Sequence, residues 1–120
     1  MKQEEFNELF RQRTKKFAVD VIKYCNTLPP TPASRVIVYQ LIKSATSVAA
    51  NYRAACRARS KAEFHSKMSI VVEEGDESQL WLETIEESGI DNSPELFRLH
   101  QEALEIVKVC SKARSTASGN

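Results

Sequence analysis

Apolar residues recur along the chain at alternating intervals of three and four positions, the spacing of one face of an α-helix. The clearest run lies in residues 34–88 and forms two consecutive stripes. The first stripe contains Ile37, Leu41, Ser44, Val48, Asn51 and Ala55, and the second contains Phe64, Met68, Val71, Gly75, Ser78 and Leu82. Because only a short turn at Arg59 and Ser60 separates them, the stripes predict two antiparallel helices.

This turn also predicts how the two helices pair. Folding the segment back between Arg59 and Ser60 places Ser44 opposite Gly75. Neither residue has a long side chain, so we expect the closest approach of the two helices here, below the usual separation of roughly 8–10 Å.

Similar stripes predict a helix on either side of this pair. One covers residues 4–28 and ends at the proline-rich segment LPPTPAS, after which Ser34 or Thr31 caps the next helix. The other begins after Ser93 and Pro94 and extends to about Ala113. We therefore predict an all-α, antiparallel up-down-up-down four-helix bundle, with one domain over residues 1–114 and a disordered tail over residues 115–120.

Composition agrees with a single soluble domain. The chain has 120 residues, of which 42% are hydrophobic, and contains only three glycines and four prolines. Cys25, Cys56 and Cys110 are an odd number without the spacing of metal ligands, so we expect buried thiols in a reducing cytoplasm. We find no apolar signal region and no run long enough to span a membrane, and we predict a cytoplasmic protein without a metal or cofactor.

The net charge of +1 hides a strong asymmetry along the chain. Residues 9–62 contain eleven basic residues and one acid, whereas residues 63–105 contain twelve acids and two bases. Up-down topology would gather one end of each helix, and this end would form a basic pole. The basic pole consists of Arg11, Arg13, Lys15, Lys16, Arg53, Arg57, Arg59, Lys61, Lys67, Lys108, Lys112 and Arg114.

A basic pole predicts binding to nucleic-acid phosphates, most simply RNA, without strong sequence preference. We expect the main contacts from Arg53, Arg57, Arg59 and Lys61, and a second set from Arg11, Arg13, Lys15 and Lys16. Basic residues near helix C-termini also offset the helix dipole and keep a surface soluble, which is the simpler interpretation of any single one. No platform of exposed aromatic residues is evident, so sequence-specific readout of single strands is not expected.

Other candidate sites are weaker, and we do not expect an enzyme. Acidic residues at 73, 74, 76 and 77 could suggest a metal site in a bundle, but no glutamate has a histidine three residues later. Glu74 and Glu77 are expected instead to pair with a basic residue of another helix or subunit. Arg59 and His65 loosely resemble a sequence element of all-helical RNases, although Arg59 belongs to the turn.

Helices two and three carry more apolar residues than one stripe each requires. The additional residues are Val36, Val38, Ile42, Ala49, Ile70, Val72, Leu80 and Trp81, close to Tyr39 and Tyr52. Excess apolar surface commonly marks a subunit interface, so we predict a homo-oligomer.

Residues 40–89 resemble the four-helix bundle family of proteins encoded within intervening sequences of bacterial 23S rRNA genes. The features that carry this resemblance are the small residues before Asn51-Tyr52, the turn at residues 60–64, Lys67-Met68-Ser69-Ile70, Glu74, Glu77-Ser78 and Trp81-Leu82. With the first and last helices, the likeness covers about residues 6–112. Ala54 departs from it, because many members have a glutamate there.

The resemblance implies a closed ring of bundles, commonly a pentamer, and no enzymatic activity. It also implies an architecture similar to the accessory protein of diversity-generating retroelements, which binds nucleic acid and reverse transcriptase through basic surfaces. One alternative is a protein–protein scaffold whose basic pole docks an acidic protein partner or the acidic pole of another copy, or an accessory subunit, for example of a reverse transcriptase or ribonucleoprotein, that does not touch nucleic acid. Another is an RNase that uses Arg59 and His65.

Overall fold

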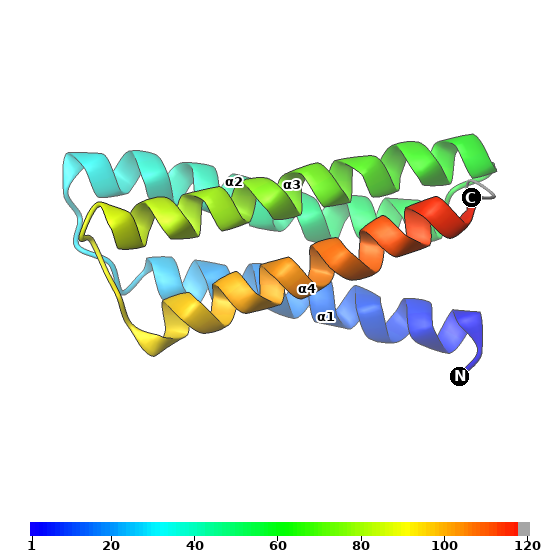
Figure 1. The fold of residues 1–120 in the computed structure, drawn as a ribbon, viewed down its shortest axis with the longest axis horizontal. Coiled ribbons are helices and arrows are strands. Elements are labelled where there is room, and N and C mark those ends of the chain that lie inside the picture. The colour runs from blue at the N-terminus through cyan, green and yellow to red at the C-terminus, as the bar shows by residue number, and fades with distance from the viewer. Residues whose placement is uncertain (118–120) are drawn as a thin grey trace.

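Four α-helices make up the protein in the computed structural model, which describes residues 1–117. They are α1 (Gln3–Cys25), α2 (Pro32–Cys56), α3 (Lys61–Glu87) and α4 (Pro94–Ala117). Each helix runs antiparallel to the preceding one and packs beside its neighbours in an elongated bundle of 45 × 23 × 20 Å (Figure 1). The predicted all-α up-down-up-down bundle is confirmed. Within the described part of the chain, no helix is long and apolar enough to cross a membrane.

Short polar side chains start three of the helices. The backbone N–H of Ser34 donates to Thr31 Oγ1 at 3.2 Å, so Thr31 is the cap of α2 and Pro32 occupies its first turn. Ser60 caps α3 by accepting from the N–H of Glu63 at 3.0 Å. Leu96 N–H donates to Ser93 Oγ at 3.4 Å at the start of α4. These side chains satisfy amide groups that have no partner within the helix.

Two predicted helix ends differ from the structure. α1 ends at Cys25, three residues before the predicted end, because the turn toward Pro29 already begins there. α4 continues through Ala117, so residues 115–117 are helical and the predicted disordered tail is wrong for them. No proline or glycine interrupts this stretch, and Thr116 Oγ1 donates to the carbonyl of Lys112 at 3.0 Å. Residues 118–120 lie outside the described residues.

The core follows the two predicted central stripes. Most of their residues are buried, including Leu41, Val48, Val71 and Leu82, each with no exposed surface. Ile37, Asn51 and Phe64 are only half-buried. α1 and α4 add Phe17, Val21, Leu99 and Ile106 from the other side of the bundle. Cys25 and Cys110 are buried and Cys56 is half-buried, all as free thiols.

The predicted partner of Gly75 is wrong. A Cβ atom added to Gly75 would lie 2.6 Å from Cγ2 of Val107, so the open side of Gly75 faces α4 and not Ser44 on α2. Ser44 Oγ instead lies 2.9 Å from Ser78 Oγ, one turn further along α3. The position of Gly75 therefore requires a small residue because α4 packs against it. The contact between α2 and α3 includes the buried hydrogen bond between Ser44 and Ser78. The turn between α2 and α3 remains at the predicted place, so the ends of the helices still gather as expected.

Candidate nucleic-acid interface

One end of the bundle brings together the start of α1, the end of α2, the start of α3 and the end of α4 (Figure 1). The opposite end holds the end of α3 and the start of α4, with Glu83, Glu86, Glu87, Asp91 and Glu95. Lys23 and Arg35 also lie at this opposite end, and Glu8 and Glu63 lie at the first end, so the antiparallel fold concentrates basic residues at one end and acidic residues at the other without separating them completely.

Four members of the basic pole line a groove between α1 and α2. One hollow of about 390 Å³ is lined by Arg11, Arg53 and Arg57 together with Glu8 and Gln12. An adjoining hollow of about 290 Å³ shares Arg11 and Arg53 with the first, and is also lined by Lys15, Ala49 and Ala50. We call Arg11, Lys15, Arg53 and Arg57 the basic groove. The methyl side chains of the two alanines leave room between the helices.

Most of the charge in the basic groove is not neutralised. Arg11 is bound to Glu8, with its Nε donating to Glu8 Oε2 at 2.9 Å. Hydrogen bonds from Arg11, and then from Gln12, lower the pKa of Glu8, so this carboxylate stays charged at neutral pH. Lys15, Arg53 and Arg57 are exposed and form no ion pair with any residue of the range 1–117. Three cations therefore remain available to phosphate groups.

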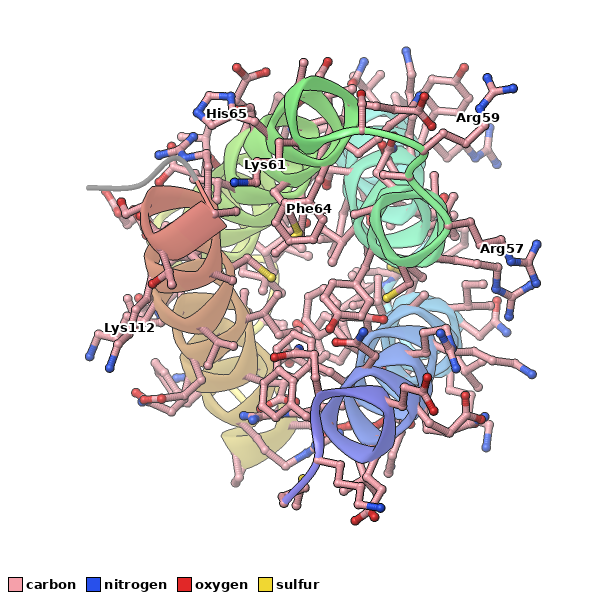
Figure 2. The ribbon with its side chains drawn as sticks, turned by 90° about the vertical axis from the view of Figure 1, so that its right-hand side faces the viewer. Arg57, Arg59, Lys61, Phe64, His65 and Lys112 are labelled. Carbon is pink, nitrogen blue, oxygen red and sulfur yellow. The ribbon has the colours of Figure 1, made fainter. Side chains whose placement is uncertain are left out.

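Arg59 and Lys61 lie at the tip, where α2 turns into α3. The side chain of Arg59 is 90% exposed and lies 3.7 Å from Glu63, a loose ion pair in water that contributes little. Figure 2 looks onto this end and shows Arg57 and Arg59 extending to one side, while Lys112 extends from the opposite side of the bundle. The basic side chains surround the end and do not converge on one point.

Four of the eight predicted contact residues form ion pairs within the bundle, namely Arg11 with Glu8, Arg59 with Glu63, Arg13 with Glu102 and Lys16 with Asp20. Arg13 joins α1 to α4 through two hydrogen bonds to Glu102, of 2.7 and 2.8 Å, and these bonds raise the pKa of Arg13. Lys16 lies near the middle of α1 and donates to Asp20 at 2.8 Å. The structure therefore brings Arg11, Lys15, Arg53 and Arg57 together in the groove and places Arg59 and Lys61 at the tip. Arg13 and Lys16 lie outside both regions, bound to Glu102 and Asp20.

Sequence reasoning missed an apolar hollow at the same end. It measures about 660 Å³ and opens between the first turns of α1 and the last turns of α4. Phe6, Phe64 and Val109 contribute apolar walls, and Lys112 lies among the lining residues. Phe6 and Phe64 begin the apolar stripes of their helices, and α1 and α4 share the least contact of the four neighbouring pairs. Where α1 and α4 have little contact, an apolar residue at the end of the bundle, such as Phe6, lines a cavity instead of packing in the core.

The geometry does not favour the RNase alternative. Figure 2 shows Arg59 and His65 extending in different directions from the two sides of the start of α3. Both side chains are exposed, and Arg59 is next to Glu63. A general base and a cation that stabilises charge must both reach one reacting phosphate, which this separation does not provide. In residues 1–117, no group of three or more histidine, cysteine or acidic side chains is arranged to hold a metal ion.

The outer surface of α2 and α3 is partly apolar. Val36 and Tyr39 on α2 and Leu80 on α3 are 63%, 64% and 52% exposed, and we refer to these three residues as the apolar patch. Other members of the predicted excess, such as Val38, Ile42, Val72 and Trp81, pack against the core instead. Single exposed apolar residues are common on monomers, and only a contiguous apolar surface of more than roughly a few hundred Å² marks an interaction site.

Glu74 and Glu77 lie on the same surface without forming an ion pair to another described residue. Trp81 Nε1 donates to Glu77 at 3.2 Å. Burial, followed by the neighbouring charge of Glu77, raises the pKa of Glu74. The predicted basic partner on another helix is therefore absent from residues 1–117, although Lys43 is near enough to act on Glu74 electrostatically.

Comparisons with known proteins agree on one family. A crystal structure from Bacteroides thetaiotaomicron, described as a protein with unknown function from the S23 ribosomal protein family, matches this fold with a TM-score of 0.83 and 25% sequence identity. The match covers 91% of this chain and 97% of that chain. No curated protein matches the sequence. The family model described as 23S rRNA-intervening sequence protein matches residues 7–112, and the chain therefore belongs to this family.

Proposed function

We propose that this chain binds RNA through its basic groove and the tip of the basic pole, as a non-enzymatic helical bundle that forms a homo-oligomer. The observation that carries this proposal is the groove between α1 and α2, where Lys15, Arg53 and Arg57 are exposed and form no ion pair with another described residue, and where Glu8 is the one acid among the lining residues. Unpaired cations along a groove attract a phosphate backbone and release its counterions.

The description of the matched family refers to an intervening sequence of 23S rRNA and names no ligand, so the choice of RNA over DNA is part of this proposal. The basic groove contains arginines and lysine but no exposed aromatic ring. Phosphate contacts position a nucleic acid and carry no direct sequence information. We therefore propose binding to structured RNA with little dependence on the sequence of its paired regions.

The test is fluorescence anisotropy with a labelled structured RNA at salt concentrations between about 50 and 200 mM. Affinity should fall steeply with salt, and Arg53→Ala/Arg57→Ala should weaken binding and reduce the logarithmic slope by about two units. A matched control is Lys23→Ala/Arg35→Ala, which removes two exposed charges at the opposite end of the bundle. Affinity that is independent of salt, or an equal loss in both double variants, would contradict the proposal.

Subunit association is proposed for the apolar patch. Burying Val36, Tyr39 and Leu80 against another copy would remove apolar surface from water at about 25 cal/mol per Å². The family resemblance makes a pentamer the expected assembly. Native mass measurement should show an oligomer, and Tyr39→Glu should dissociate it because an interface does not accept an unpaired charge. A monomer at micromolar concentration would contradict this part of the proposal.

The apolar patch also supports a second candidate function, a scaffold or accessory subunit for another protein. A pull-down with and without nuclease separates the two functions. A partner that survives nuclease treatment and is lost in the Tyr39→Glu variant is held by the apolar patch, whereas a partner lost with nuclease is held through nucleic acid.

A further inference from the structure

The apolar hollow beside the start of α1 has the chemistry of a site for a flat aromatic ring. Phe6 and Phe64 reach it from two different helices, and Val109 contributes an aliphatic wall from α4. Figure 2 shows Phe64 directed inward between the helices at this end of the bundle. The volume of about 660 Å³ lies within the range of roughly 300–1,000 Å³ that is usual for small-ligand sites.

Polar groups at its edge match those of a nucleobase. Gln3 and Asn7 both line the hollow, and Gln3 Nε2 donates to Asn7 Oδ1 at 2.8 Å. This bond leaves the Gln3 carbonyl and the Asn7 amino group available, one acceptor and one donor. The edges of unpaired bases carry donors and acceptors of this kind, and their faces stack on aromatic side chains.

Positive charge lies on two sides of the hollow. Lys112 is one of its lining residues, and Lys61 lies one turn before Phe64 on α3, where residues three positions apart are neighbours. Both lysines are exposed. The backbone of a bound nucleotide carries phosphates, so cations beside a hollow that can admit a base are complementary to it.

We propose that this hollow holds one unpaired base of a bound RNA, so that the protein prefers RNA with a bulge or loop over a continuous duplex. The proposal rests on the RNA binding described above and adds a second contact to it. The groove holds the backbone of paired RNA, and the hollow accepts a base that is already unstacked. α1 and α4 are the least tightly packed neighbours, so the ring enters without displacing the buried core.

The test compares two RNAs that differ by one nucleotide: a short duplex, and the same duplex with a single bulged adenosine. Anisotropy at one fixed salt concentration should show about tenfold tighter binding of the bulged RNA, the usual effect of stacking one base on an aromatic side chain. Phe6→Ala, at a residue that is already 36% exposed, should remove this preference and leave the affinity for the duplex unchanged.

A second variant should also abolish the preference for the bulged RNA, by adding a side chain to the hollow instead of removing one. Ala113→Ile adds an aliphatic group to the lining of the hollow, and should also equalise the two affinities. Circular dichroism of both variants checks that the helices are retained. Arg53→Ala/Arg57→Ala is the control, because it should weaken both RNAs by the same factor and preserve their ratio.

Three results would overturn the proposal and can be told apart. Equal affinity of the unaltered protein for both RNAs, with salt-dependent binding of the duplex, removes the base site and leaves the proposed function intact. A bulge preference that survives both Phe6→Ala and Ala113→Ile removes the hollow as its cause. If neither RNA binds, the proposed function fails and the base site fails with it.

Discussion

Replacing Gly75 by alanine tests how α3 packs against α4. In an isolated helix this change is stabilising by about 1 kcal/mol, because alanine loses less backbone entropy than glycine. In this bundle the new methyl group would lie 2.6 Å from Cγ2 of Val107, well inside the contact distance of about 3.5–4.0 Å. Valine in a helix has one strongly preferred rotamer, so it cannot easily turn away.

The gain in helix propensity and the steric clash with Val107 oppose each other, so their relative sizes decide whether Gly75→Ala stabilises or destabilises the protein. Overpacking a well-filled core costs about 1–3 kcal/mol. After subtraction of the helix-propensity gain, we expect Gly75→Ala to lower the free energy of unfolding by about 1 kcal/mol, or the melting temperature by about 4 °C. The measurement is urea and thermal unfolding followed by circular dichroism, at one protein concentration because assembly contributes to stability.

A double variant identifies the atom responsible. Val107→Ala removes the methyl group that the new Cβ meets, so Gly75→Ala/Val107→Ala should be more stable than the sum of the single changes by about 1 kcal/mol. The corresponding pair with Ser44→Ala should be additive, because Ser44 hydrogen bonds to Ser78 and does not face Gly75. A Gly75→Ala protein that gains the full helix-propensity stabilisation would refute this packing.

Two further predictions concern acid stability and thiol reactivity. Hydrogen bonds from Lys16, and then from Arg98, lower the pKa of Asp20 below its usual 3.8, so its contribution is present above that pH and disappears as pH falls through the lower value. Asp20→Asn should therefore cost about 0.5–1 kcal/mol in urea unfolding at pH 7, and progressively less as the pH is lowered below 3.8; a cost that does not change with pH would contradict this. Burial raises the pKa of the Cys25 thiol to about 11 and that of Cys110 to about 12. With a thiol reagent at pH 8, half-buried Cys56 should react first, and mass mapping of peptides would expose the opposite order.

The helices were largely predictable because their signals are local. Thr31, Ser60 and Ser93 each cap a helix within three residues of the amide they bind. The end of α4 was missed because Ser115 and Thr116 are weak helix formers, although Ala117 is a strong one. Such residues follow their neighbours into a helix when no proline or glycine stops them.

The candidate site was predictable only as a region. Arg53 and Arg57 lie in the groove because the topology alone brings the end of α2 beside α1. The hydrogen bond from Arg13 to Glu102 joins residues 89 positions apart in the sequence. Which acidic residue the Arg13 side chain reaches depends on the rotation of α1 about its axis relative to α4. The hollow lined by Phe6 depends on that pair separating at one end, which the spacing of apolar residues does not encode.

By itself, the sequence determined four amphipathic helices, their order and the segregation of basic and acidic residues along the chain. These properties arise from the helical period, capping groups and turn lengths, all of which act within a few residues. Only the tertiary structure decided that Gly75 meets Val107, that Ser44 meets Ser78, and that an aromatic-lined hollow opens beside the basic pole. Those contacts depend on the rotation and separation of whole helices, because a stripe of apolar residues faces the bundle interior without specifying which neighbour each residue touches.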